Sequence, residues 1–153
     1  MRVGIIGAGL VGRKRAKAIG NHQLLAVADV EENRAKELAA AYGCRWTRDW
    51  KDVVEDSSID LVIVSTTNDW LAPITTAAIK NGKHVLVEKP AARNPRELQS
   101  VIKVAKKHPE VKVKVGFNHR FHPAIQKARE IFESGKLGRL MYIRGRYGHG
   151  GRK

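Results

Sequence analysis

The stretch RVGIIGAGLVG, residues 2–12, decides the fold of this chain. Its first part, residues 2–7, is dense in Val and Ile and predicts a buried strand. The glycines of its second part follow the pattern Gly-x-Gly-x-x-Gly, and a helix is predicted over residues 10–19. That pattern alone is weak. Here it follows a predicted strand and opens a predicted helix, which is the context that a dinucleotide-binding turn requires.

Each glycine of such a turn has its own role. Gly7 makes the tight turn, Gly9 lets the backbone approach a pyrophosphate, and Gly12 permits close packing of the helix on the strand. The unpaired N–H groups and the positive dipole end of the helix then hold the phosphates. The turn residues predicted to bind the cofactor are Gly7, Ala8, Gly9, Leu10, Val11 and Gly12.

Asp29 completes this fingerprint at the end of the second apolar run. A carboxylate about 20 residues after the glycines accepts the ribose hydroxyls of the adenosine half. The alternative is that Asp29 only caps the following helix. An acid here repels a 2′-phosphate, which favours NAD(H). NADP(H) stays possible, because Arg34 or the basic run 13–15 could turn toward a phosphate.

Short apolar runs alternate with helical patterns over the first 118 residues. This alternation is typical of strand–helix–strand units around a parallel sheet. The prediction is an α/β Rossmann fold, a doubly wound and mostly parallel sheet of strand order 3-2-1-4-5-6. The predicted strands are 2–7, 24–30, 44–47, 60–66, 83–89 and 111–118, and the predicted helices are 10–19, 31–43, 49–56, 72–82 and 94–108.

The remaining sequence predicts the beginning of a second, α+β domain. Residues 123–135 form an amphipathic helical pattern and residues 137–148 a strand pattern. A lone strand has no sheet to join, and unpaired edges are a liability. We therefore expect the chain to be the front part of a longer protein, with a dinucleotide-binding domain at 1–120 and an incomplete second domain at 121–153.

Composition narrows the possible partners. The net charge is +14, and residues 91–153 carry 16 Lys and Arg against 4 Asp and Glu. This excess follows neither a recognition motif nor the aromatic pattern of RNA-binding surfaces, so nucleic acid is not an expected partner. No apolar run reaches the roughly 20 residues of a membrane span. The single cysteine, Cys44, and the scattered histidines predict neither disulfides nor a metal site. A cytoplasmic location fits this composition.

The rest of the chain then resembles a known family. Residues 84–92 (HVLVEKPAA) and 65–69 (STTND) look like two turns of the glucose–fructose oxidoreductase / inositol dehydrogenase (Gfo/Idh/MocA) family. Residues 115–130 and 137–151 resemble that family's connection to its second domain. The resemblance implies a second domain with an open, mostly antiparallel sheet. In the family, that domain covers the nicotinamide and supplies a catalytic histidine with an acid.

The resemblance assigns the chemistry to Lys89. A lysine at the end of the fifth strand stabilises the charge that develops on a substrate oxygen and can relay its proton. Glu88, Lys89 and Pro90 are implied to line the cofactor, and the Lys89–Pro90 bond is implied to be cis. The alternative for Lys89 is an ordinary strand-end charge.

Polar residues of two other segments are implied to complete the site. Thr66, Thr67 and Asn68 offer hydroxyl and amide groups to the cofactor, although a turn or capping role is the alternative. Leu71 occupies a position where the family usually has histidine. The residues implied to face the substrate are Asn118, His119 and Arg120, and His122 is expected to have a structural role.

Together these features predict an NAD(P)-dependent oxidoreductase that transfers hydride to or from a secondary alcohol of a sugar, cyclitol or sugar derivative. The full-length parent is expected to be a homo-oligomer. The 153-residue chain itself is expected to bind the dinucleotide and to lack the full active site. The alternative from another class is a non-catalytic dinucleotide-binding or sensor module.

Overall fold

A six-stranded parallel sheet organises the chain, and its strand order is β3-β2-β1-β4-β5-β6. The computed structural model describes residues 1–146 and 148. The predicted fold class and strand order are confirmed. The strands are β1 (Arg2–Ile6), β2 (Gln23–Ala28), β3 (Arg45–Thr47), β4 (Leu61–Val64), β5 (His84–Val87) and β6 (Val113–Val115).

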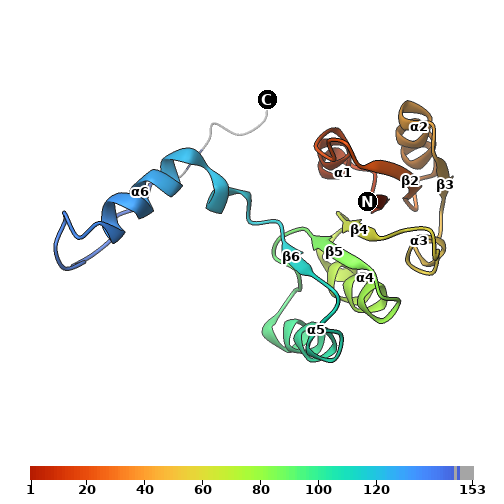
Figure 1. Cartoon of the computed structure of the whole chain (residues 1–153). Coiled ribbons are helices and arrows are strands. Elements are labelled where there is room, and N and C mark those ends of the chain that lie inside the picture. The colour runs from red at the N-terminus through yellow and green to blue at the C-terminus, as the bar shows by residue number, and fades with distance from the viewer. Residues whose placement is uncertain (147, 149–153) are drawn as a thin grey trace. The chain divides into compact units, whose positions relative to one another are not determined.

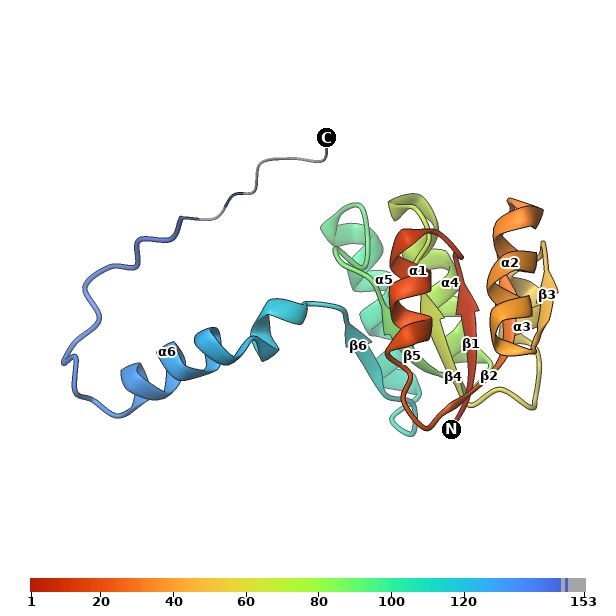
Figure 2. The same cartoon turned by 90° about the horizontal axis from the view of Figure 1, so that it is seen from above.

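Helices cover both faces of this sheet (Figures 1 and 2), and its central strands are accordingly apolar and buried apart from their first residues. Two apolar cores result, one on each face. The helices α1 and α2 pack on one face, and α3, α4 and α5 pack on the other. Their bounds are α1 (Leu10–Lys17), α2 (Glu32–Tyr42), α3 (Lys51–Val54), α4 (Asn68–Lys80) and α5 (Pro95–Lys107).

Local signals explain where α2 ends and where α5 begins. Gly43, in the left-handed region at φ 62°, ends α2, as expected of a C-terminal glycine. Asn94 begins α5, because its side-chain oxygen accepts a hydrogen bond from the N–H of Glu97 at 3.0 Å and Pro95 follows at the first helical position.

The start of α4 differs from the sequence prediction. The pattern predicts a helix over 72–82, with Pro73 near its beginning, whereas α4 begins at Asn68 and contains Pro73 in its interior. Proline removes one intrahelical hydrogen bond. Burial compensates, because Leu71 and Ile74 on either side of it lie in the core. The segment 68–71, expected as a turn, is therefore the first turn of a helix.

The described residues from 118 onward form a second compact unit, and residues 1–117 form the first. Within it, Asn118–Phe121 form a 3-10 helix, η1, and α6 spans Pro123–Glu133. The strand predicted over 137–148 is wrong for residues 137–146 and 148, which form no strand. A strand needs a neighbour to pair with, and the described part of this unit offers none. Residue 147 lies outside the described residues.

Across residues 1–146 and 148, no helix is both long enough and apolar enough to span a bilayer. The same residues hold no cluster of three or more His, Cys, Asp or Glu side chains suited to a metal ion.

Candidate functional site: the carboxyl edge of the sheet

The segments that leave four neighbouring strands are linked at one edge of the sheet. The N–H of Gly7 donates to the carbonyl of Ala28 at 2.8 Å, and the N–H of Ser65 donates to that of Ile6 at 2.8 Å. The N–H of Glu88 donates in the same way to Val64, at 2.9 Å. Because the carboxyl ends of parallel strands form the ligand-binding edge of such a sheet, these links bring the predicted site segments of residues 1–117 together.

The three glycines of the first turn differ in the space around them. Gly7 has φ 97°, and a Cβ there would lie 2.5 Å from the carbonyl oxygen of Ser65. A Cβ on Gly12 would lie 1.9 Å from the carbonyl oxygen of Gly7, so α1 packs directly on the turn. A Cβ on Gly9 would meet nothing within 4 Å. Gly7 and Gly12 therefore make the turn, while Gly9 leaves an open cradle at the start of α1.

Ser65 joins this turn to the end of β4, a role that sequence reasoning missed. Its hydroxyl donates to the carbonyl of Gly7 at 2.8 Å and approaches that of Ile6 at 3.2 Å. The Ile6 carbonyl thus accepts from both the backbone N–H and the hydroxyl of Ser65, and the Gly7 carbonyl accepts from the hydroxyl. Serine in a turn carries no distinctive signal, so only the fold reveals the contact.

Asp29 lies at the rim of the same turn. One carboxylate oxygen accepts from the N–H of Ala8 at 2.6 Å, and the other accepts from the N–H of Glu31 at 2.9 Å. The second bond supports the chain entering α2. This is the helix-capping role that the sequence left open as the alternative for Asp29. The first bond holds the carboxylate against the glycine turn, where it can also receive ribose hydroxyls.

The turn after β4 leads directly into α4. Thr67 is the N-cap residue, and Asn68 and Asp69 belong to the first turn of the helix. The Thr67 hydroxyl holds the pKa of the Asp69 carboxyl below its usual range. The Thr66 hydroxyl donates to the carbonyl of Thr67 at 3.3 Å. Leu71 is fully buried, so the position where the family usually has histidine points into the core.

The segment after β5 places Glu88 and Lys89 in different surroundings. Glu88 is only 8% exposed, and its carboxylate pairs with the guanidinium of Arg15, with Nε 2.6 Å from Oε1. Lys89 is exposed, and the Lys89–Pro90 peptide bond is cis, as the resemblance implies. The N–H of Ala91 donates to the carbonyl of Glu88 at 3.0 Å and closes a turn around Lys89 and Pro90.

Two cations that kept NADP possible are held by carboxylates. The guanidinium of Arg13 lies 2.7 Å from Glu37 and donates to the carbonyl of Ala8 at 3.3 Å. Arg15 is paired with Glu88. Neither arginine is therefore placed as an uncommitted phosphate ligand.

The predicted substrate residues belong to the second unit. Asn118, His119 and Arg120 lie in η1, and all three are exposed. His122 accepts a hydrogen bond from the N–H of Ala124 at 3.2 Å and caps α6, which confirms its expected structural role.

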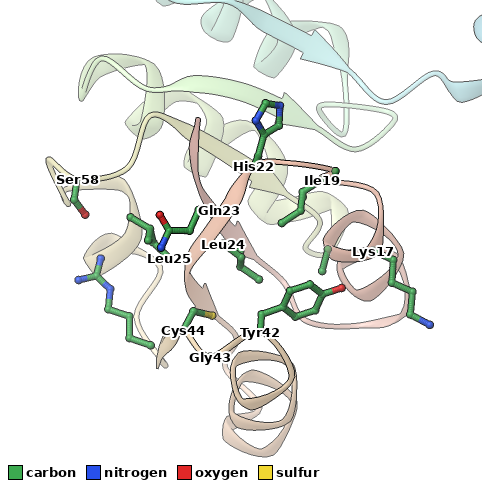
Figure 3. Close-up of a pocket in the computed structure, with 13 residues that line it drawn as sticks. Lys17, Ile19, His22, Gln23, Leu24, Leu25, Tyr42, Gly43, Cys44 and Ser58 are labelled. Atoms are coloured by element: carbon green, nitrogen blue, oxygen red, sulfur yellow. The ribbon is translucent and has the colours of Figure 1, made fainter.

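A cavity of about 660 Å³ lies at the opposite, amino-terminal edge of the sheet (Figure 3). The end of α1, the start of β2 and the chain after α2 line it, with Lys17, His22, Tyr42 and Cys44 among its residues. Burial raises the pKa of the Cys44 thiol, which disfavours the reactive thiolate. This cavity contains none of the predicted site residues.

Known proteins with similar sequences belong to a family with the same fold. Residues 1–117 match a family described as an oxidoreductase family with an NAD-binding Rossmann fold. Myo-inositol 2-dehydrogenase of Thermotoga maritima is 32% identical over 94% of this chain and 44% of its own length. The chain spans about half the length, or less, of the curated relatives it matches.

Two solved structures similar to this chain contain a dinucleotide. Scyllo-inositol dehydrogenase of Lactobacillus casei with bound NAD(H) and scyllo-inositol superposes with a TM-score of 0.85 at 25% identity, over 90% of this chain and 42% of that one. Levoglucosan dehydrogenase in complex with NADH and levoglucosan gives a TM-score of 0.84 at 30% identity, over 91% of this chain and 40% of that one.

Proposed function

Because this chain belongs to the Gfo/Idh/MocA oxidoreductase family with its NAD-binding Rossmann fold, we propose that it is the dinucleotide-binding part of a dehydrogenase. The parent protein oxidises a secondary alcohol of a sugar, cyclitol or sugar derivative, or reduces the corresponding ketone. Relatives named for inositol and levoglucosan support this class of substrate. The proposal also takes the parent to be a cytoplasmic homo-oligomer.

The open cradle at Gly9 carries the proposal. The first N–H groups of α1 have no acceptor within the helix, and the helix dipole is positive at this end. A pyrophosphate can approach them because Gly9 has no side chain there and no other atom fills the space. The carboxylate of Asp29 accepts from the N–H of Ala8 in the same turn, which supports the proposed contact with the adenosine ribose. The residues present therefore fit a dinucleotide.

Lys89 is the residue proposed to act on the substrate. The bound NAD supplies a hydride acceptor at its nicotinamide. Lys89 leaves the same edge of the sheet two strands from the glycine turn, and its exposed ammonium can stabilise negative charge on the substrate oxygen and take up its proton. Asn118, His119 and Arg120 are proposed to contact the substrate.

Calorimetric titration of the 153-residue chain with NADH and NADPH tests the cofactor site. We expect NADH to bind and NADPH to bind at least about tenfold more weakly, because Asp29 repels a 2′-phosphate. Absence of NADH binding to the folded chain would overturn the proposal. For the parent protein, Lys89→Ala is expected to lower kcat for inositol oxidation by at least about 100-fold, in line with loss of a general acid–base group.

A further inference from the structure

A buried ion pair joins α1 to the segment that carries Lys89. The side chains of Arg15 and Glu88 are 19% and 11% exposed, and the guanidinium reaches Oε1 through both Nε and a terminal nitrogen. Other arginine–carboxylate pairs are more open. In Arg93–Glu97, which has the same arrangement of donors, the arginine side chain is 58% exposed.

Gly116 packs against this ion pair. Its N–H donates to the carbonyl of Val87 at 2.8 Å, which fixes it beside the end of β5. A Cβ on Gly116 would lie 2.9 Å from the Arg15 guanidinium and 3.0 Å from Oε1 of Glu88. The ion pair therefore occupies the space that any side chain at position 116 would enter.

A buried pair of this kind adds little net stability, since desolvation of both charges offsets their attraction. Its geometric effect is stronger. An arginine that donates through two nitrogens of its rigid guanidinium to one carboxylate oxygen restricts the distance and the direction between the two elements that it joins. Here these elements are the pyrophosphate helix α1 and the first residue after β5, immediately before Lys89.

The strand order decides which half of the cofactor this pair affects. Asp29 follows β2 on one side of β1, and Lys89 follows β5 on the other side. A dinucleotide with its pyrophosphate at α1 and its adenosine ribose at Asp29 must extend its nicotinamide half toward β4 and β5. Arg15 points to this side, away from the position where a 2′-phosphate would lie.

We propose that Arg15 is a positioning residue that, with Glu88 and Gly116, sets the place of Lys89 against the nicotinamide half of the cofactor. This inference rests on the proposed dinucleotide function. It predicts that loss of the Arg15–Glu88 ion pair weakens contacts to the nicotinamide half of the cofactor and leaves the adenosine diphosphate half bound. A merely structural pair would affect both halves alike.

The test compares NADH with ADP-ribose, which lacks the nicotinamide, by calorimetric titration of the 153-residue chain. Arg15→Met is expected to weaken NADH binding about tenfold, the size of one lost hydrogen bond to a charged group, and to change ADP-ribose binding by less than about twofold. Arg15→Lys, which keeps the charge, should recover part of the loss. Arg93→Met, the matched control on an exposed pair, should change neither ligand.

Two further variants keep the test decisive if Arg15→Met does not fold. Glu88→Gln removes the buried charge, and Gly116→Ala pushes a methyl group against an intact pair. Both should also weaken NADH more than ADP-ribose. Equal weakening of the two ligands, or no weakening, in folded variants would overturn the inference. A wild-type chain that binds neither ligand would instead refute the proposed function.

Discussion

Replacing Gly9 with Asp should abolish NADH binding without destabilising the fold. Gly9 is the N-cap residue of α1, with φ −70° and ψ −167°, a backbone that any residue adopts. Asp is a better N-cap residue than Gly by a few tenths of a kcal/mol, and its charge at the positive helix end adds about 0.3–1 kcal/mol. We therefore expect the free energy of unfolding to rise by about 0.5–1 kcal/mol.

The same carboxylate would occupy the open cradle where the pyrophosphate must lie. Two unit charges 4 Å apart repel by about 4 kcal/mol at an effective dielectric constant of about 20. This repulsion corresponds to roughly a thousandfold loss of affinity. Screening at physiological salt weakens it, so a loss of at least about 100-fold is expected.

Calorimetric titration with NADH, combined with thermal unfolding followed by circular dichroism, measures both effects. Gly9→Asn is the matched control, because Asn has nearly the same size and capping ability without the charge. It should lose less affinity than Gly9→Asp. If folded Gly9→Asp keeps its NADH affinity within about threefold of the wild type, the pyrophosphate does not lie at Gly9 and the assignment of the site is wrong.

Three further predictions concern stability. Gly12→Ala should lower the free energy of unfolding by about 2 kcal/mol or more, because its Cβ would lie 1.9 Å from the Gly7 carbonyl; urea unfolding measures this. Asp60→Asn should make the free energy of unfolding less dependent on pH in acid. Arg2 holds the pKa of the Asp60 carboxyl below its usual range, so this contribution is complete above about pH 4 and is lost as the pH falls further. Thermal unfolding between about pH 2 and pH 5 checks the difference, and an unchanged dependence on pH would contradict it. At Ala91, which is buried with φ 73°, Ala91→Gly should stay within about 1 kcal/mol of the wild type, since relief of backbone strain offsets the lost methyl group and the added chain entropy. Ala91→Val should cost about 2 kcal/mol or more, and equal stability of the two variants would refute this account.

The sheet and its glycine turn could be predicted because their signals are local. Buried parallel strands appear as continuous apolar runs, and the turn at 7–12 combines a strand, three glycines and a helix in one short segment. The order of the six strands then follows from the right-handed, short connections of the fold class. The position of Asp29 beside this turn could be predicted for the same reason, since Asp29 lies at a fixed distance along the chain from the glycines.

The rest depends on contacts between distant residues or on burial. Arg15 and Glu88 are 73 positions apart, and nothing in either segment indicates the other. The start of α4 differs from the prediction because proline is common at the first position of a helix, whereas α4 begins five residues before Pro73 and buries Leu71 and Ile74. The strand pattern over 137–146 has no pairing neighbour among the residues that the structure describes, and periodicity alone does not reveal whether a neighbour exists.

The basic run 13–15 shows how the two kinds of information combine. In sequence it looks like a single cluster of charge facing one phosphate. On α1, however, positions 13 and 15 lie about 200° apart around the helix axis, so their side chains diverge. Arg13 accordingly reaches Glu37 on α2, and Arg15 reaches Glu88 after β5. If the cofactor lies across α1 as proposed, Arg13 is on the adenosine side and Arg15 on the nicotinamide side. Variants of Arg15 should then change the ratio of NADH to ADP-ribose affinity in calorimetric titration, whereas variants of Arg13, which is paired with Glu37, should leave that ratio unchanged.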